Sequence, residues 1–327
     1  MGAKQFISGV PVPVCGLALG LAALDRFLYS DIHYYNHNIL ALFAVALIAL
    51  FTLRLATDLP GIRRDLENPA VFGIFPTYPM AIMVLSATAR EYVGDIALAV
   101  WSGAIVFNFV LIYFFAKRFL RRPSLRDVFP SWTVMFTGYV IASTTSPAFG
   151  TEAVGQILFW FGFVAYLTVL PVILWRVLRM GLPKDLVPQL AIFAGPVNLC
   201  VVGCIRSYDY APPGIPLAIL SVLGVISYAA VILYMPVMLN RKFYPSFSAF
   251  TFPLVISSIS IYEYGKLHGF SSMYAFEIIQ AATLAIAVIS VLHVLIRYMI
   301  YFYRTARAAL SVPHREAHFR QAPPDPE

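Results

Sequence analysis

Long apolar stretches recur along almost the whole chain, and the charged residues are confined to the gaps between them. Sixty per cent of the residues are hydrophobic and 12% are charged, against roughly 25% charged in an ordinary soluble domain. A helix needs about 20 mostly apolar residues to cross the hydrocarbon core of a bilayer. Because stretches such as 38–56, 93–115 and 273–302 reach that length, the sequence predicts an all-α integral membrane protein.

Ten spans are expected when the whole chain is divided in this way. They cover residues 6–28, 38–56, 71–89, 93–116, 131–146, 153–176, 189–206, 216–238, 246–264 and 273–302. We therefore expect one transmembrane domain over 1–302 and a disordered cytoplasmic tail over 303–327, whose end is rich in proline. So little chain remains outside the spans that no soluble catalytic domain fits. No phosphate loop, nucleophile elbow or zincin motif occurs, and we expect neither an enzyme nor a cofactor or metal site.

The positive charges alternate from one side of the membrane to the other with every expected crossing. If both termini are cytoplasmic, that side receives 19 of the 23 Lys and Arg residues, and only Arg26, Arg90, Arg206 and Lys266 fall on the other side. Such a bias is the positive-inside rule, so we expect a multi-pass protein of the cell membrane with both termini in the cytoplasm. Topology and contact with anionic lipid account for the net charge of +7 without a nucleic-acid partner.

Five consecutive helical hairpins form a second level of organisation, because the odd-numbered spans begin near residues 6, 71, 131, 189 and 246. The odd spans are interrupted by glycine and proline, among them Gly16, Pro79, Gly138, Pro196 and Pro253, whereas the even spans are mostly plain Leu, Ile, Val and Phe. Broken backbone at membrane depth is tolerated where it is packed in protein or lines a cavity. Close helix packing alone also explains glycine and proline, but the fivefold repetition favours five inner helices around a central pathway and five outer helices facing lipid.

Several short motifs carry a resemblance to a known family. Residues 13–24 (PVCGLALGLAAL) are similar to the first helix of the bacterial tellurite-resistance protein TehA, and residues 68–76 (NPAVFGIFP) to the entry of its third helix. Further matches are 163–166 with 171–174, 194–196 (AGP), and 249–253 (AFTFP). In order and spacing the chain resembles the tellurite-resistance and dicarboxylate transporter family, which also includes yeast malate transporters and the slow-type anion channels of plant guard cells.

The resemblance implies a homotrimer in which each protomer has its own pore along a quasi-fivefold axis, closed midway by a phenylalanine of the ninth helix. The matching residue is Phe252, beside Pro253, which can kink the helix. A bulky ring in a narrow pore blocks by sterics and dewetting. Packing between helices is the alternative role for Phe252, and Phe250 is a rival for the gate. We expect Gly16, Pro79, Gly138, Pro196 and Pro253 to line the pore.

The chemistry of the expected inner helices favours anions. Apart from residues at the ends of spans, they contain no ionisable group near mid-membrane, where a coupled carrier commonly keeps a carboxylate or histidine and a cation channel needs acidic rings. Hydroxyl groups such as those of Thr137 and Thr144 either face the path or bond locally within their helices. We expect a channel for small anions; the alternative is a proton-coupled transporter or exporter of dicarboxylate (malate), sulfite or tellurite oxyanions.

Overall fold

The computed structural model describes residues 2–33, 38–240 and 242–311, and every regular element in these ranges is helical. The α-helices are α1 (Gly2–Ser8), α2 (Val14–Arg26), α3 (Ile39–Thr57), α4 (Leu59–Asp65), α5 (Pro69–Ile74), α6 (Thr77–Val93), α7 (Asp95–Phe119), α8 (Ser131–Thr137), α9 (Ile141–Thr145), α10 (Glu152–Met180), α11 (Ala194–Ser207), α12 (Gly214–Leu239), α13 (Phe252–Leu267) and α14 (Tyr274–Ser311). The short helices are the π-helical turn η1 (Phe27–Asp31) and the 3₁₀ segments η2 (Leu125–Asp127), η3 (Gly138–Val140), η4 (Ser146–Phe149), η5 (Val187–Phe193), η6 (Pro245–Phe250) and η7 (Phe270–Ser272).

Eight helical segments in the described part of the chain are long and apolar enough to cross a membrane, so the prediction of an α-helical membrane protein is confirmed. The stretches expected as the first and fifth spans are divided into shorter pieces. Pro11 and Pro13 separate α1 from α2, and η3 separates α8 from α9. Proline removes a backbone donor and ends the preceding helix, which explains the first break. The last helix continues to Ser311, and the rest of the expected tail lies outside the described residues.

Burial alternates along the chain as the glycine and proline pattern predicts. In the membrane-length segments Pro69–Val93, Val187–Ser207 and Pro245–Leu267, between 83% and 89% of the apolar window is buried, against 22–28% in the other five. Every residue of α2 from Val14 to Asp25 is buried as well, and so are α9 and nearly all of α8. We call the segments 11–26, 69–93, 131–145, 187–207 and 245–267 the inner segments, because the remaining long helices pack outside them.

Four of the five inner segments change their helical geometry part of the way along. Segments η5 and η6 precede α11 and α13, and Pro76 separates α5 from α6. The short i→i+3 bonds of a 3₁₀ turn tighten the chain without leaving its amides unpaired inside the bundle. The breaks can therefore lie inside the bundle without leaving backbone amides unpaired.

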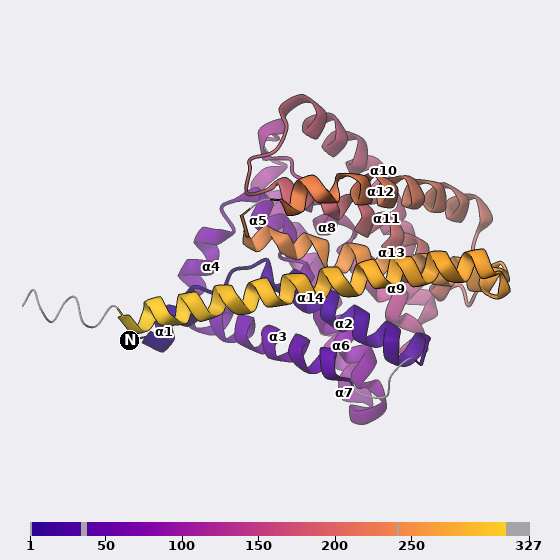
Figure 1. The fold of residues 1–327 in the computed structure, drawn as a ribbon, viewed down its shortest axis with the longest axis horizontal. Helices are drawn as coiled ribbons and strands as arrows, with labels where there is room; N and C mark the ends of the chain where they lie inside the picture. Colours follow the sequence, from indigo (N-terminus) through magenta and orange to yellow (C-terminus); the bar gives the residue numbers. More distant parts are fainter. Residues whose placement is uncertain (1, 34–37, 241, 312–327) are drawn as a thin grey trace, which may run out of the picture.

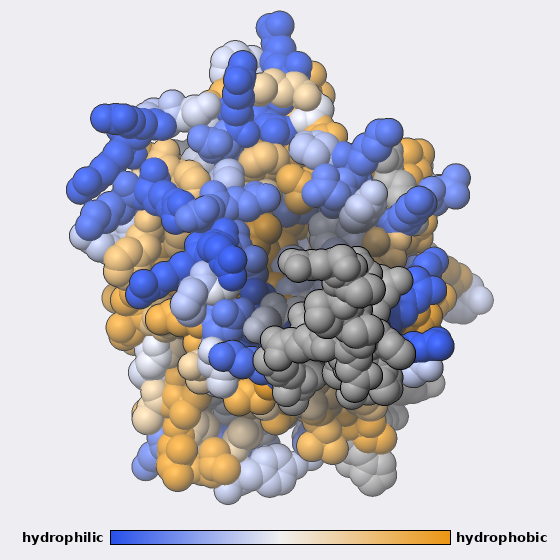
Figure 2. Space-filling model, turned by 90° about the vertical axis from the view of Figure 1, so that its left-hand side faces the viewer, coloured by the Kyte–Doolittle hydropathy of each residue, from blue (hydrophilic) through white to orange (hydrophobic). Residues whose placement is uncertain are grey.

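The two described ends of the chain lie on the same side of the bundle, where α1 packs against the last turns of α14 (Figure 1). The Phe6 and Phe302 rings are 6.1 Å apart, and the Tyr301 hydroxyl donates to the carbonyl oxygen of Gly9 over 3.2 Å. Seen from this end, hydrophilic residues gather over the upper part of the face, and hydrophobic ones are more abundant toward the bottom (Figure 2). We call this end of the bundle the basic end, because it carries Arg63, Arg64 and the basic connection 117–126.

Candidate ion pathway

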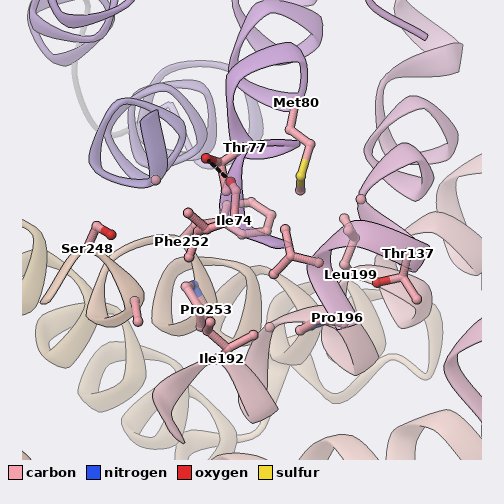
Figure 3. A pocket seen from close by; sticks show the side chains of 15 residues that line it. Ile74, Thr77, Met80, Thr137, Ile192, Pro196, Leu199, Ser248, Phe252 and Pro253 are labelled. Atoms are coloured by element: carbon pink, nitrogen blue, oxygen red, sulfur yellow. Dashed lines mark hydrogen bonds between the residues drawn. The ribbon is translucent and has the colours of Figure 1, made fainter. Parts of the chain in front are cut away.

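A cavity of about 30 Å³ lies at the centre of the bundle, and all five inner segments contribute to its wall (Figure 3). The lining residues are Gly16 from α2; Ile74, Thr77 and Met80 around the α5–α6 break; Val134, Thr137 and Gly138 around the α8–η3 break; Ile192, Gly195, Pro196 and Leu199 around the η5–α11 break; and Ser248, Ala249, Phe252 and Pro253 around the η6–α13 break. Four of the five contributions thus come from points where the helix changes geometry.

The structure brings five of the six predicted site residues to this cavity. Gly16, Gly138, Pro196, Phe252 and Pro253 all line it, although they are distributed over four inner segments. The sixth residue, Pro79, is buried in α6, one position before Met80, but is not part of the cavity wall.

Phe252 also lines a second cavity, of about 20 Å³, on the side of the ring away from the basic end. This cavity is also lined by Ala23, Val84, Ile141 and Val202. Each of them comes later in its inner segment than the residues of that segment that line the central cavity. The Phe252 side chain therefore stands between two spaces that the same five segments enclose. Its exposed fraction is 6%, so the side chain is almost completely covered by its neighbours.

Phe250 has a different environment, although it lies only two residues away. It is fully buried, and its ring packs edge-on against that of Phe247 with centroids 5.6 Å apart. It lines neither of the cavities that Phe252 separates. A change of two residues on a helical path turns the side chain to a different face, which explains why these two phenylalanines have different neighbours.

The junction before Phe252 is held by a direct contact between the first and last inner segments. The Thr251 hydroxyl donates to the carbonyl oxygens of Gly16, over 2.9 Å, and Ser248, over 2.7 Å. Gly20 lies so close that a Cβ atom on it would be 2.6 Å from Thr251 Cβ and 2.9 Å from the Phe252 nitrogen. Only glycine permits such an approach, which brings α2 against the backbone at Thr251 and Phe252.

The hydroxyl groups along the inner segments mostly bond within their own helices. Thr77 donates to Ile74 O over 2.7 Å, Thr137 to Thr133 O over 2.6 Å and Thr144 to Ile141 O over 2.8 Å. These three hydroxyl groups therefore donate to nearby backbone carbonyls, which is the alternative to a role in the path. The wall of the central cavity carries no charged side chain.

A wide vestibule precedes the central cavity at the basic end. It has a volume of about 420 Å³ and is bounded by the first residues of four inner segments and by the polar side chains of Arg64, Asp65, Asn68 and Gln189. The vestibule, the central cavity and the cavity beyond Phe252 are lined by successively later residues of the same segments, for example 186 and 189, then 192 and 195, then 202 and 206. The three spaces therefore follow one another along the bundle.

A buried charge cluster closes the far end of this series, and the sequence analysis did not identify it. Arg206 reaches Asp31 over 2.6 Å and Glu263 over 2.6 Å, so it joins three elements that are distant in sequence. Tyr210 donates to the other oxygen of Glu263 over 2.5 Å. Burial, followed by this hydrogen bond, raises the pKa of the Tyr210 phenol, which keeps it a donor. Arg206 and Asp31 line the second cavity, together with Arg26.

One sequence signal did point to this cluster. Arg206 is one of the four basic residues that the topology expected from the sequence places on the side poor in cations. An arginine at the end of an inner span on that side needs a local reason, which the two carboxylates supply.

Comparison with known proteins agrees with this architecture. No match to the chain was found among curated proteins. The model of the SLAC1 family, described as voltage-dependent anion channel, matches residues 10–299 and so covers nearly all of the described bundle, including the inner segments and Phe252. This family includes TehA-like proteins and the plant slow anion channels, so the resemblance found in the sequence is confirmed. The chain belongs to the SLAC1 family of anion channels and transporters.

Proposed function

We propose that this protein is an anion channel of the cell membrane, in which the path through each protomer is closed by the side chain of Phe252. The observation that carries the proposal is that this ring separates two cavities enclosed by the same five inner segments. A vestibule continues the series toward the basic end. Small anions would move along this path once the ring leaves the space between the cavities.

The chemistry of the path supports an anion rather than a cation. Among the residues that the structure describes, the wall of the central cavity is formed by glycine, proline, apolar and hydroxyl side chains and has no carboxylate, whereas cation channels use acidic rings. The inner helices α6, α11 and α13 begin at the wall of the central cavity, so their positive dipole ends face an ion that enters from the basic end.

The proposal includes the arrangement expected from the sequence. Ten crossings pair into five hairpins, with the inner segments in a quasi-fivefold ring around the path, and three copies assemble as a homotrimer with one pore each. Both termini lie in the cytoplasm, which makes the basic end the cytoplasmic one. The buried and exposed segments alternate as such a ring requires, and the described ends lie on one side.

The second candidate is a proton-coupled transporter or exporter of malate, sulfite or tellurite oxyanions. One observation favours it, namely that the carboxylates of Asp31 and Glu263 lie at the far end of the path. A coupled carrier needs a titratable group on the substrate route. These carboxylates are held by Arg206 and lie beyond the central cavity, so conduction remains the better supported function.

Current recorded from purified protein in planar bilayers separates the two candidates. A channel gives a reversal potential that follows the anion gradient and does not move when a proton gradient is added. A coupled carrier gives a reversal potential that shifts with the proton gradient. Absence of anion current or flux, both in the parent protein and after Phe252→Ala, would contradict both candidates.

A further inference from the structure

An apolar groove lies on the outside of the bundle near the basic end. Its volume is about 500 Å³, and it lies among the 120–128 connection, α8 and α10. Val128, Trp132 and Phe136 contribute to its wall from one part of the chain, and Val169, Val172 and Ile173 from another. Apolar walls at membrane depth are suited to a hydrocarbon chain.

One polar atom in this wall has no protein partner. The indole nitrogen of Trp132 is buried and makes no hydrogen bond to any residue that the structure describes, and the side chain is only 5% exposed. A buried indole N–H usually donates to an acceptor. Trp132 lines the groove, and a small turn of its buried ring would bring this donor to an acceptor beside the hydrocarbon part of an occupant.

The rim of the groove carries cations that are free of ion pairs with the described residues. Arg121, Arg122 and Arg126 are exposed and belong to the same connection whose Ser124 and Leu125 line the groove. Neighbouring Arg118 differs, because it lies 3.7 Å from Glu67. Basic clusters beside a membrane helix attract anionic headgroups.

We propose that this groove binds an anionic phospholipid. Arg121, Arg122 and Arg126 hold the headgroup, Trp132 donates to an ester carbonyl, and an acyl chain lies against α8 and α10. The site is separate from the proposed pore and does not depend on its function. It is nevertheless one helix away from it, because Val134 and Thr137 of the same helix α8 line the central cavity.

A second exterior groove provides an internal comparison. It has a volume of about 350 Å³ and lies between α6 and α7 at the opposite end, lined by residues such as Ile82, Tyr92 and Ile96. The nearest cation in sequence, Arg90, is paired with Asp95 at 2.8 Å. Both grooves are therefore apolar. The groove beside α8 and α10 differs from the second one in having unpaired basic residues at its rim.

Native mass spectrometry of the full-length protein can test the proposal with phosphatidylglycerol and phosphatidylcholine of identical chains. We expect the parent protein to retain phosphatidylglycerol in preference. Arg121→Gln, Arg122→Gln and Arg126→Gln combined should lower that preference at least tenfold. Trp132→Phe should lower retention about three- to tenfold, as expected for one hydrogen bond. The control, Arg63→Gln with Lys184→Gln, removes two exposed cations from the same end and should leave the preference unchanged.

Fluorescence quenching by phosphatidylglycerol with brominated chains locates the bound lipid. The part of the tryptophan fluorescence that the brominated lipid quenches should be smaller in Trp132→Phe than in the parent protein, by the contribution of one tryptophan. Equal retention of the two lipids by the parent protein, or an unchanged preference in the triple variant, would overturn the proposal. An unquenched Trp132 together with cross-links between copies through cysteines placed at Thr168 would also overturn it and assign the groove to contact between protomers.

Discussion

Replacing Phe252 by alanine is the sharpest test of the proposed gate. The cavities on its two sides measure about 30 and 20 Å³, and a cavity needs roughly 10–15 Å³ to hold a single water molecule. Neither cavity can therefore hold a hydrated anion while the ring is in place. The substitution removes the phenyl group between them and joins the two spaces into one.

The expected effect on flux is large. Each ~1.4 kcal/mol removed from a barrier raises a rate tenfold, and an apolar ring in a narrow pore blocks both by its volume and by excluding water. We expect Phe252→Ala to raise anion flux at least tenfold. The measurements are single-channel current in planar bilayers and anion efflux from proteoliposomes at matched protein density.

Phe250→Ala is the matched control, because it removes the same ring from a site two residues away. Phe250 is fully buried against Phe247, so its loss should cost about 3–5 kcal/mol of stability. Phe252 faces cavities on both sides, and its loss should cost less. Phe250→Ala should therefore lower yield and thermal stability in detergent without opening a conductance. The gate assignment is refuted if both variants are silent in bilayers, or if only Phe250→Ala conducts.

Three further predictions concern the close approach at Gly20, the buried ion pair of Arg206 and the membrane topology. Gly20→Val should destabilise the protein by about 1–3 kcal/mol, measured by thermal unfolding in detergent, because a Cβ atom at this position would lie 2.6 Å from Thr251 Cβ. Arg206→Gln should cost about 3–5 kcal/mol, because it leaves buried Glu263 without its cation, and the same assay measures it. A cysteine introduced at Ser124 should react with a membrane-impermeant maleimide only after the cells are opened, as expected for a cytoplasmic loop.

Each of these predictions has a control elsewhere in the chain. Gly103→Ala introduces a Cβ with no neighbour within 4 Å and should not destabilise the protein. Arg90→Gln breaks an exposed ion pair and should cost no more than about 1 kcal/mol. Glu91→Cys lies at the opposite end and should be labelled in intact cells. Labelling of Ser124→Cys in intact cells would reverse the proposed topology, and neutral behaviour of Gly20→Val would contradict the close approach of α2 to α13.

The division into inner and outer helices could be predicted from the sequence, because it depends on the residue composition of each helix and not on its neighbours. Glycine and proline break the helices of the buried segments, whereas the exposed helices run on without a break even where α10 and α12 contain Pro171 and Pro236. For the same reason Gly16, Gly138, Pro196 and Pro253 were good indicators of the central cavity.

Which individual side chains face the cavity could not be predicted from the sequence in the same way. Pro79 has the same residue type as Pro196, but its position on α6 keeps it out of the cavity wall, which neighbouring Met80 occupies. The charge cluster was missed because Asp31, Arg206 and Glu263 lie in three distant parts of the chain. Only the tertiary arrangement brings their side chains together.

The contrast between inner and outer segments also has a consequence for how the protein enters the membrane during synthesis. The buried segments Pro69–Val93, Val187–Ser207 and Pro245–Leu267 are less hydropathic than the outer helices, and each is followed in the chain by an outer helix. A weakly apolar segment partitions poorly into lipid alone, so we expect the hairpin, rather than the single helix, to be the unit of insertion. A reporter fusion ending after residue 267 should insert its last segment inefficiently, and extending the fusion through α14 should restore insertion. Substitutions that make an inner segment more polar would then be tolerated as long as the outer helix that follows it remains strongly apolar.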